Sequence, residues 1–310
     1  MIGLTLSKLA KLAHVSVSTV SKAFSMSNEI HPETREMIFA VAKEHGCFKK
    51  YYKAKYPKPV ITILCPEFKY AEAVSAAQQR LAELGCEISV ASTDFSPKTE
   101  MELLQYYDRY TEVDGVIIID GTADSYDSND LPIVVVSRNP KAKLRVNVSC
   151  EAGMREAIEY FESKQATPIA FVGEPLTPRT KRNFEKLCPQ GIVEIAKGRF
   201  EKGGYQAMEN LLKLEERPRA LICAYDYMAM GAIRCIQDHG LSVPEDIAVM
   251  GINNTHSCPF IEPPLSSIDA HVNDGCRIAA DVLLAYLMGE PYEEETVMPT
   301  KVCYRRSTEI

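Results

Sequence analysis

The stretch T-L-S-K-L-A-K-L-A-H-V-S-V-S-T-V-S-K-A-F, residues 5–24, decides how the amino-terminal part of this chain folds. Its apolar residues recur at helical spacing on both sides of a short polar interruption, which predicts a helix, a tight turn and a second short helix. Ser16 lies where the second helix should begin, and its hydroxyl can accept a hydrogen bond from a free backbone N–H. A third helix is expected to begin at Pro32 and to end at Gly46.

The outer face of the predicted second helix combines short side chains with one cation, namely Val17, Ser18, Ser21 and Lys22. Such a face fits the major groove of DNA, where small groups can approach base edges and a cation can approach a phosphate. His14 lies in the preceding turn, where a positive φ is expected and His is better tolerated than most residues. A three-helix bundle that binds another protein is the alternative interpretation.

The charges of the chain are divided unevenly. Residues 1–58 contain ten basic residues and four glutamates, a net charge of +6, whereas residues 59–310 contain 25 basic and 38 acidic residues, a net charge of −13. A basic end on an acidic body is typical of a polyanion-binding part joined to a domain that does not bind polyanions. Five of the lysines lie between positions 49 and 58, where they either contact phosphates or form a solvated linker.

Cysteine usage and hydropathy exclude several classes of protein. The ten cysteines are scattered singly without a C-x-x-C pair, so neither a metal site nor a disulfide framework is expected, and most should be buried thiols. No cofactor is expected. No apolar run approaches membrane-spanning length, and the amino end, interrupted by Lys8 and Lys11, does not resemble a secretory signal. The expected compartment is the cytoplasm.

After residue 59 the sequence alternates between short β-rich runs and amphipathic helices. Strands are expected over 60–65, 86–91, 116–120, 133–137, 146–148, 169–172, 193–197, 220–223 and 247–251, with helices over 71–84, 98–110, 152–163, 201–214 and 226–239. This alternation favours parallel sheets with right-handed crossovers. Two such sets in series predict two lobes, with a cleft at the carboxyl ends of the strands.

Several of these motifs resemble one known family. The order T-L-x-x-L-A-x-L-A-x-V-S-V-S-T-V-S-K-A-F followed by P-E-T-R-E is similar to the headpiece of the lactose/galactose-repressor (LacI/GalR) family. The long run at 224–254, the P-P-L-S-S-I at 263–268 and the R-R-S-T ending at 305–308 also resemble that family. The resemblance therefore extends over nearly the whole chain.

The resemblance implies a multidomain protein, with an all-α helix-turn-helix headpiece followed by an α/β, two-lobed, periplasmic-binding-protein-like domain. The implied headpiece with its basic hinge covers 1–57, and an effector-binding and dimerisation domain covers 58–310. Within the latter, the amino lobe should comprise about 59–146 plus 269–297, and the carboxyl lobe about 148–268 plus 298–310. Three crossings between the lobes are expected near 146–149, 266–270 and 296–300.

The resemblance also implies which headpiece residues bind DNA. By position, Val17, Ser18 and Lys22 should contact bases, with Lys22 as the best candidate for reading guanine. The hydroxyl groups of Thr5, Ser16, Thr19 and Ser21 should contact phosphates and so position the headpiece.

The stretch 47–57 departs from the family's usual hinge. It has no Pro-Asn pair, Tyr56 stands where a leucine usually wedges into the minor groove, and Pro57 would stop a hinge helix. We therefore expect weaker insertion into the minor groove, with Lys49, Lys50 and Lys53 supplying more of the affinity. Tyr56 remains a candidate DNA contact.

The candidate effector site also departs from the family. By position it includes Arg179, Thr180, Phe184, Tyr225, Asp226 and Asn253. Tyr225 stands where many members have Asn, and Asn253 where they have Asp, so the cleft would lose a carboxylate and gain an aromatic wall. A simple sugar is therefore less expected as effector. The alternative interpretation is that Tyr225 and Asn253 only pack the cleft and no ligand is needed.

The resulting prediction is a homodimeric regulator, a repressor rather than an activator, that binds a near-palindromic double-stranded DNA operator and a small-molecule effector. An enzyme is disfavoured because the sequence has no Gly-rich phosphate loop, G-x-S-x-G elbow or H-E-x-x-H motif, and its six histidines lack ligand spacing. A periplasmic sugar receptor is disfavoured by the basic headpiece. A DNA-binding protein that needs no effector remains the rival interpretation.

Overall fold

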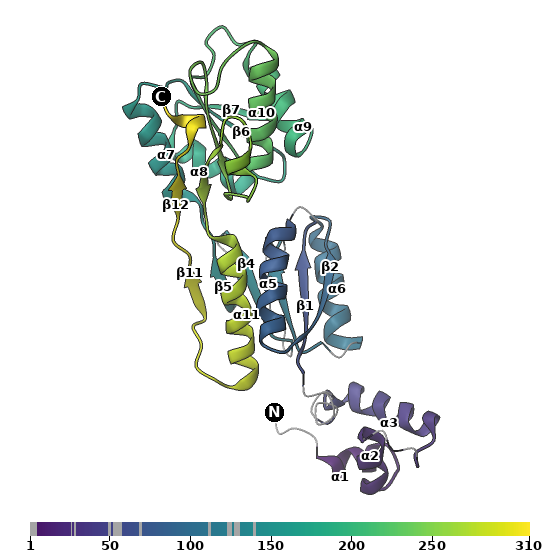
Figure 1. Ribbon diagram of the computed structural model, residues 1–310. Helices are drawn as coiled ribbons and strands as arrows, with labels where there is room; N and C mark the ends of the chain where they lie inside the picture. Colours follow the sequence, from purple (N-terminus) through teal and green to yellow (C-terminus); the bar gives the residue numbers. More distant parts are fainter. Residues whose placement is uncertain are drawn as a thin grey trace.

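A computed structural model describes residues 5–25, 27, 29–48, 51, 58–67, 70–110, 113–122, 126, 131–138 and 141–310. A small helical headpiece, a first α/β lobe and a second α/β lobe lie in a row, and the carboxyl terminus belongs to the second lobe (Figure 1). The headpiece contains the helices α1 (Leu6–Leu12), α2 (Val17–Phe24) and α3 (Pro32–Glu44).

Side-chain caps begin the first two helices. Thr5 Oγ1 accepts a hydrogen bond from the Lys8 N–H at 3.3 Å, and Ser16 Oγ accepts one from the Thr19 N–H at 2.9 Å. The predicted cap at Ser16 is thus confirmed. His14, in the turn between the two helices, has a φ of +53°, in the left-handed region that was expected there. These local features fix how the second helix leaves the first.

The headpiece has a hydrophobic core of its own. Helical spacing brings buried residues of α1, α2 and α3 together, and four aromatic rings complete the core. Phe24 lies 5.0 Å from Phe39, 5.6 Å from Phe48 and 5.6 Å from Tyr51, measured between ring centroids. Phe48 and Tyr51 therefore belong to the headpiece core, although the sequence analysis assigned both to the hinge.

The first lobe is built on a six-stranded sheet in the order β11-β5-β4-β3-β1-β2, in which all neighbours are parallel. Its elements are β1 (Val60–Cys65), α5 (Ala71–Glu83), β2 (Glu87–Ser92), α6 (Pro97–Tyr110), β3 (Gly115–Ile119), β4 (Ile133–Ser137), β5 (Leu144–Asn147), α11 (Val272–Met288) and β11 (Glu295–Val297). Helices α5 and α11 cover one face and α6 the other. Strands β3 and β4 are buried along their whole length, which explains their continuous apolar runs.

The second lobe repeats this plan with the strand order β12-β10-β9-β8-β6-β7. Its elements are α7 (Glu151–Ser163), β6 (Ile169–Gly173), α8 (Pro178–Leu187), β7 (Ile192–Ile195), α9 (Phe200–Leu211), β8 (Ala220–Cys223), α10 (Asp226–Asp238), β9 (Ala248–Ile252), η2 (Cys258–Phe260), β10 (Ser266–Asp269), β12 (Lys301–Cys303) and η3 (Arg306–Thr308). Helices α9 and α10 pack against each other, as do α7 and α8. The helix α8 was missed by the sequence analysis, which expected two strands without a helix between them.

The chain crosses between the sheets three times, after β5, after β10 and between β11 and β12. Strand β10 leaves the second sheet toward the first, whereas β12 enters the second sheet from the first (Figure 1). The two strands are neighbours, so they pair antiparallel, with Ile268 opposite Val302. Every other neighbouring pair of described strands is parallel, so the expected parallel sheets are confirmed.

Candidate functional sites

Helix α2 turns one face to the headpiece core and the other to solvent. Val20, Ala23 and Phe24 are buried. On the opposite side, the predicted contact residues Val17, Ser18 and Ser21 are exposed, and the Lys22 side chain is 45% exposed. Residues at these spacings share one side of a helix. The structure thus brings the predicted base-contacting side chains together on a single surface.

Two contacts constrain this surface. Lys22 Nζ forms an ion pair with Glu29, which lies in the segment between α2 and α3. The hydroxyl groups of Ser16 and Thr19 lie 2.7 Å apart in a hydrogen bond at the start of α2. Glu29 is a neighbour of the proposed guanine reader that the sequence analysis did not identify. Thr5 is exposed at the start of α1, and Lys49, Lys50, Lys53 and Tyr56 lie outside the described residues.

A cavity of about 90 Å³ lies between the lobes. Its walls come mainly from segments that follow the carboxyl ends of strands in both sheets, as expected for an α/β fold. The lining includes Tyr70, Glu72, Asp120, Ser137, Arg138, Arg199, Phe200, Tyr225, Tyr227, Asn253 and Asn273. A second cavity of about 260 Å³ shares Asp120, Arg138 and Tyr225 with the first. The two together form one interlobe site.

Four of the six predicted effector residues line the interlobe site, and the other two, Phe184 and Asp226, do not. Tyr225 and Asn253 line the first cavity, and Arg179 and Thr180 line the second. Phe184 is fully buried and stacks on Phe171 with the ring centroids 5.4 Å apart, so it packs in the core of the second lobe.

Asp226 also lies beneath the cavity wall. Its carboxylate accepts hydrogen bonds from Ser267 Oγ at 2.5 Å and from the Thr255 N–H at 2.7 Å. Burial raises its pKa to about 6, and these hydrogen bonds oppose that shift. Asp226 therefore holds together the strand ends around the cavity, because it joins the start of α10 to residues next to β9 and in β10.

Polar side chains of the first lobe that the sequence analysis missed complete the cavity. The Tyr70 hydroxyl donates a hydrogen bond to Asp120, and burial together with that carboxylate raises the pKa of Tyr70. Arg138 donates to Thr180 Oγ1 in the opposite lobe. Burial also raises the pKa of Tyr225, so this phenol enters the site as a neutral hydrogen-bonding ring. Asp120 and Arg138 directly follow β3 and β4, and that position was the signal that could have identified them.

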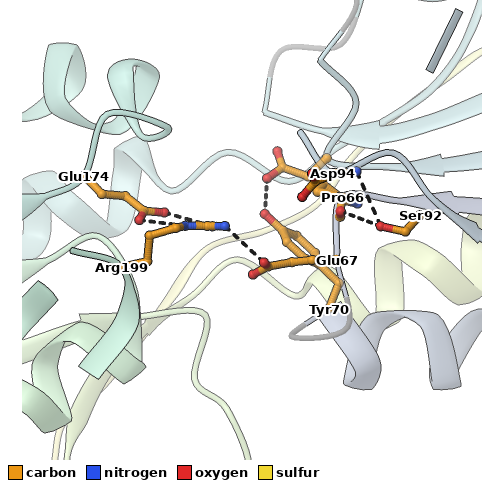
Figure 2. Close-up of polar contacts among 8 residues, drawn as sticks. Pro66, Glu67, Tyr70, Ser92, Asp94, Glu174 and Arg199 are labelled. Carbon is orange, nitrogen blue, oxygen red and sulfur yellow. Dashed lines mark hydrogen bonds and ion pairs between the residues drawn. The ribbon is translucent and has the colours of Figure 1, made fainter. Parts of the chain in front are cut away.

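Further polar contacts join the two lobes across the site. An Arg179 N–H donates to the Arg138 carbonyl oxygen at 3.1 Å. His256 Nδ1 lies 2.5 Å from a Glu72 carboxylate oxygen. Arg199 binds Glu67 and Glu174 at once (Figure 2). The lobes are thus held against each other by side chains around the cavity.

The described residues contain neither a candidate metal site nor a membrane-spanning helix. Within the described part of the chain, no group of three or more His, Cys, Asp or Glu side chains is placed to hold a metal ion. None of the described helices combines the length and apolar character needed to cross a membrane. Eight of the ten cysteines are buried and all ten are free thiols, which agrees with the expected buried thiols.

Comparisons with known proteins identify the class to which these two sites belong. The family model for bacterial regulatory proteins of the lacI family matches residues 5–48, and the model for a periplasmic-binding-protein-like domain matches residues 158–308. The HTH-type transcriptional repressor PurR of Mannheimia succiniciproducens is 30% identical over 292 residues, covering 85% of this chain and 86% of the relative. Catabolite control protein A of Staphylococcus xylosus is 24% identical, covering 98% of this chain and 99% of the relative.

Solved structures have the same fold. The lac repressor dimer bound to operator and the anti-inducer ONPF matches with a TM-score of 0.69 and 23% identity, over 99% of both chains. The regulator CelR in complex with cellobiose matches with a TM-score of 0.66 and 24% identity, over 98% of this chain and 99% of that one. Fold and sequence together define a DNA-binding transcription regulator with a periplasmic-binding-protein-like body. The chain belongs to the lacI family of bacterial regulatory proteins.

Proposed function

We propose that this chain is a homodimeric transcriptional repressor that binds a near-palindromic operator and responds to a small molecule held between its lobes. The observation that supports DNA recognition most directly is the solvent-facing side of α2, where Val17, Ser18, Ser21 and Lys22 lie together above a separate packed core. A short, capped helix with this face is suited to the major groove. Two headpieces in a dimer would read two half-sites together.

In this proposal the headpiece residues have distinct roles. Val17, Ser18 and Lys22 contact base edges, whereas Thr5, Ser16, Thr19 and Ser21 contact phosphates. The basic stretch with Lys49, Lys50, Lys53 and Tyr56 adds contacts to the DNA backbone. Residues 1–57 are proposed to form the DNA-binding part and 58–310 the effector-binding and dimerisation part, a division that the separate hydrophobic core of the headpiece supports.

The first experiment is selection of genomic fragments by the purified full-length protein at physiological salt, followed by sequencing of the retained DNA. Enrichment of a near-palindrome is the expected result. Retention without any shared sequence would contradict specific operator binding. Sedimentation of the protein with and without the selected DNA tests the dimer.

Variants then test the recognition surface. Lys22→Ala should weaken operator binding by about 1–3 kcal/mol and relax the preference at one base position of each half-site. Lys98→Ala is a matched control, since Lys98 lies on α6 of the first lobe with its side chain 84% exposed. An equal effect of both variants would mean that Lys22 contributes only charge.

The effector is proposed to bind in the interlobe site, in contact with Tyr225 and Asn253, and to change DNA affinity by binding the open and closed lobes unequally. Candidate ligands chosen from the genes next to the operator should raise the melting temperature of the wild-type protein and less so that of Asn253→Ala. If no such ligand changes operator affinity, the rival proposal of a DNA-binding protein without an effector gains support.

A further inference from the structure

Arg199 makes an unusual set of contacts at the junction of the lobes. It precedes the first residue of α9, and its guanidinium donates two hydrogen bonds to Glu174, with Nε 3.0 Å from Oε2 and Nη2 3.1 Å from Oε1. Its third bond crosses to the first lobe, where Nη1 lies 3.0 Å from Glu67 Oε2 (Figure 2). One planar cation thus engages a carboxylate of each lobe in the fork geometry that favours Arg over Lys.

Two aromatic rings enclose the same guanidinium. Its central carbon lies 4.5 Å from the ring centroid of Phe95, in the first lobe, and 4.4 Å from that of Phe200, in the second. These distances are typical of cation–π contacts. Phe95 and Phe200 have φ angles of +54° and +52°, which bulky residues rarely adopt. Backbone strain of this kind persists only where the surrounding structure imposes it.

Burial and charge distinguish this arrangement from an ordinary surface ion pair. The Glu174 side chain is completely buried, that of Glu67 is 18% exposed and that of Arg199 is 31% exposed. Two carboxylates contact one cation, so among the described residues the cluster has one more carboxylate than cations. Glu67 Oε1 is buried without a hydrogen-bond partner among the described residues. A site with surplus carboxylate, lined by two rings, is complementary to a planar cation.

We propose that Glu67, Phe95, Glu174 and Phe200 form a guanidinium-binding site, which Arg199 fills from within the same chain, and that its occupancy latches the two lobes against each other. Half of the site comes from each lobe, so it is complete only when the lobes meet. Arg199 also lines the interlobe cavity, so the latch forms part of the wall that an effector would touch. The inference depends on the two-lobed fold and not on the operator-binding function.

The strength of the latch depends on the hydrogen bond between Arg199 and Glu67, which joins the two lobes. A hydrogen bond between two charged groups stabilises the contact between the lobes. Losing the bond between Arg199 and Glu67 should therefore shift the ratio of closed to open molecules about tenfold. The contacts of Arg179 with Arg138 and of His256 with Glu72 remain, so a partial opening is expected rather than complete separation. Removing Arg199 also leaves the buried Glu174 carboxylate without its partner.

Chemical rescue of the full-length protein tests the site. In Arg199→Ala, small-angle X-ray scattering should report a larger radius of gyration than in the wild type. Methylguanidine at millimolar concentration should fill the vacant site and restore the smaller value, whereas methylurea, which is planar and uncharged, should not. Arg234→Gln, which removes an arginine that is 71% exposed and paired with Asp238 within α10, is the matched control and should change nothing.

A milder variant covers the case in which Arg199→Ala fails to fold. Glu67→Gln leaves the pairing of Arg199 with Glu174 intact and weakens only the interlobe half. The sequence contains no tryptophan, so Phe95→Trp supplies a single fluorescent reporter that retains an aromatic face toward Arg199. Adding Glu67→Gln to this protein should shift the emission to longer wavelength as water reaches the indole.

Three results would overturn the inference. The first is scattering of a folded Arg199→Ala protein that matches the wild type. The second is rescue by methylurea as effective as rescue by methylguanidine, or no rescue by either. The third is unchanged indole emission in the Glu67→Gln reporter protein. None of these readouts involves DNA, so failure of the latch and failure of operator binding are distinguishable.

Discussion

At the scale of a single residue, Asp226 should make the stability of the folded protein depend on pH. Burial raises its pKa to about 6 in the folded protein, from the ordinary value of 3.8. The folded protein therefore binds more protons than the unfolded chain between about pH 4 and pH 6. The stability that protonated Asp226 contributes is fully present below the unfolded pKa and is lost as the pH rises through the folded one.

Asp226→Asn removes this titration. The free energy of unfolding of the wild type, minus that of the variant, should fall by about 2 kcal/mol as the pH rises from 4 to 7. Urea denaturation at a series of pH values measures this difference and cancels the contributions of other carboxylates. A difference that stays constant, or that rises with pH, would contradict the assigned environment of Asp226.

The thiols give a second prediction at this scale. Burial raises the pKa of Cys235 to about 11 and those of Cys258 and Cys276 to about 12, which disfavours the reactive thiolate. In the native protein, only the half-buried Cys188 and Cys303 are expected to react with Ellman's reagent within minutes. All ten should react in denaturant. Rapid modification of more than two native thiols would contradict the observed burial.

Residue roles were only partly predictable from the sequence. The motif around Tyr225 locates the cavity, but it does not say which of two adjacent side chains faces it; Tyr225 does, and Asp226 packs beneath. Arg199 was beyond prediction, because its interlobe partner Glu67 is 132 positions away in the sequence. Such contacts depend on how the lobes meet, and neither local spacing nor composition encodes that.

At the scale of one element, the start of α2 depends on a single hydroxyl. Ser16→Ala removes the acceptor for the Thr19 N–H and should destabilise the headpiece by about 1 kcal/mol. Thermal unfolding followed by circular dichroism measures the resulting decrease in melting temperature. Ser18→Ala is the matched control, since it removes an exposed serine on the same helix that has no capping role. Equal melting temperatures for the two variants would mean that the cap contributes nothing.

Several elements were predictable from their burial pattern, although the longest helix, α11, was not among the expected helices. Strands β1, β4 and β8 have the bounds that the sequence predicts, because each is a short, mainly apolar run that is almost completely buried. Helix α8 was missed, since only Thr180 and Phe184 in it are buried and the segment contains few apolar residues. Strands β11 and β12 have three residues each, and their pairing partners β5 and β10 lie far away along the chain or across a crossing. Their existence follows from tertiary pairing and not from local sequence.

At the scale of the whole molecule, the sequence predicts one small basic unit and two α/β lobes, and the structure contains them. The contact between the lobes was not predictable, because it depends on side chains that lie far apart along the chain. The hydrophobic cores show the same division into a headpiece and a body. The headpiece core is distinct from the core clusters of the body, whereas the largest body cluster includes buried residues of both lobes.

Separate cores predict separate unfolding. Phe24 lies at the centre of the headpiece's aromatic cluster and is only 5% exposed, so Phe24→Ala should remove about 3–5 kcal/mol of headpiece stability. Calorimetry of the full-length wild type should then show a headpiece transition that the variant shifts or abolishes, while the transition of the body stays in place. Phe260→Ala, at a body residue that is 85% exposed, should move neither. If Phe24→Ala lowered the melting temperature of the body to the same degree, the two parts would unfold as one cooperative unit. A headpiece that orders independently can instead be reoriented by lobe movement without losing its own fold, which is what a switch between DNA-bound and free forms requires.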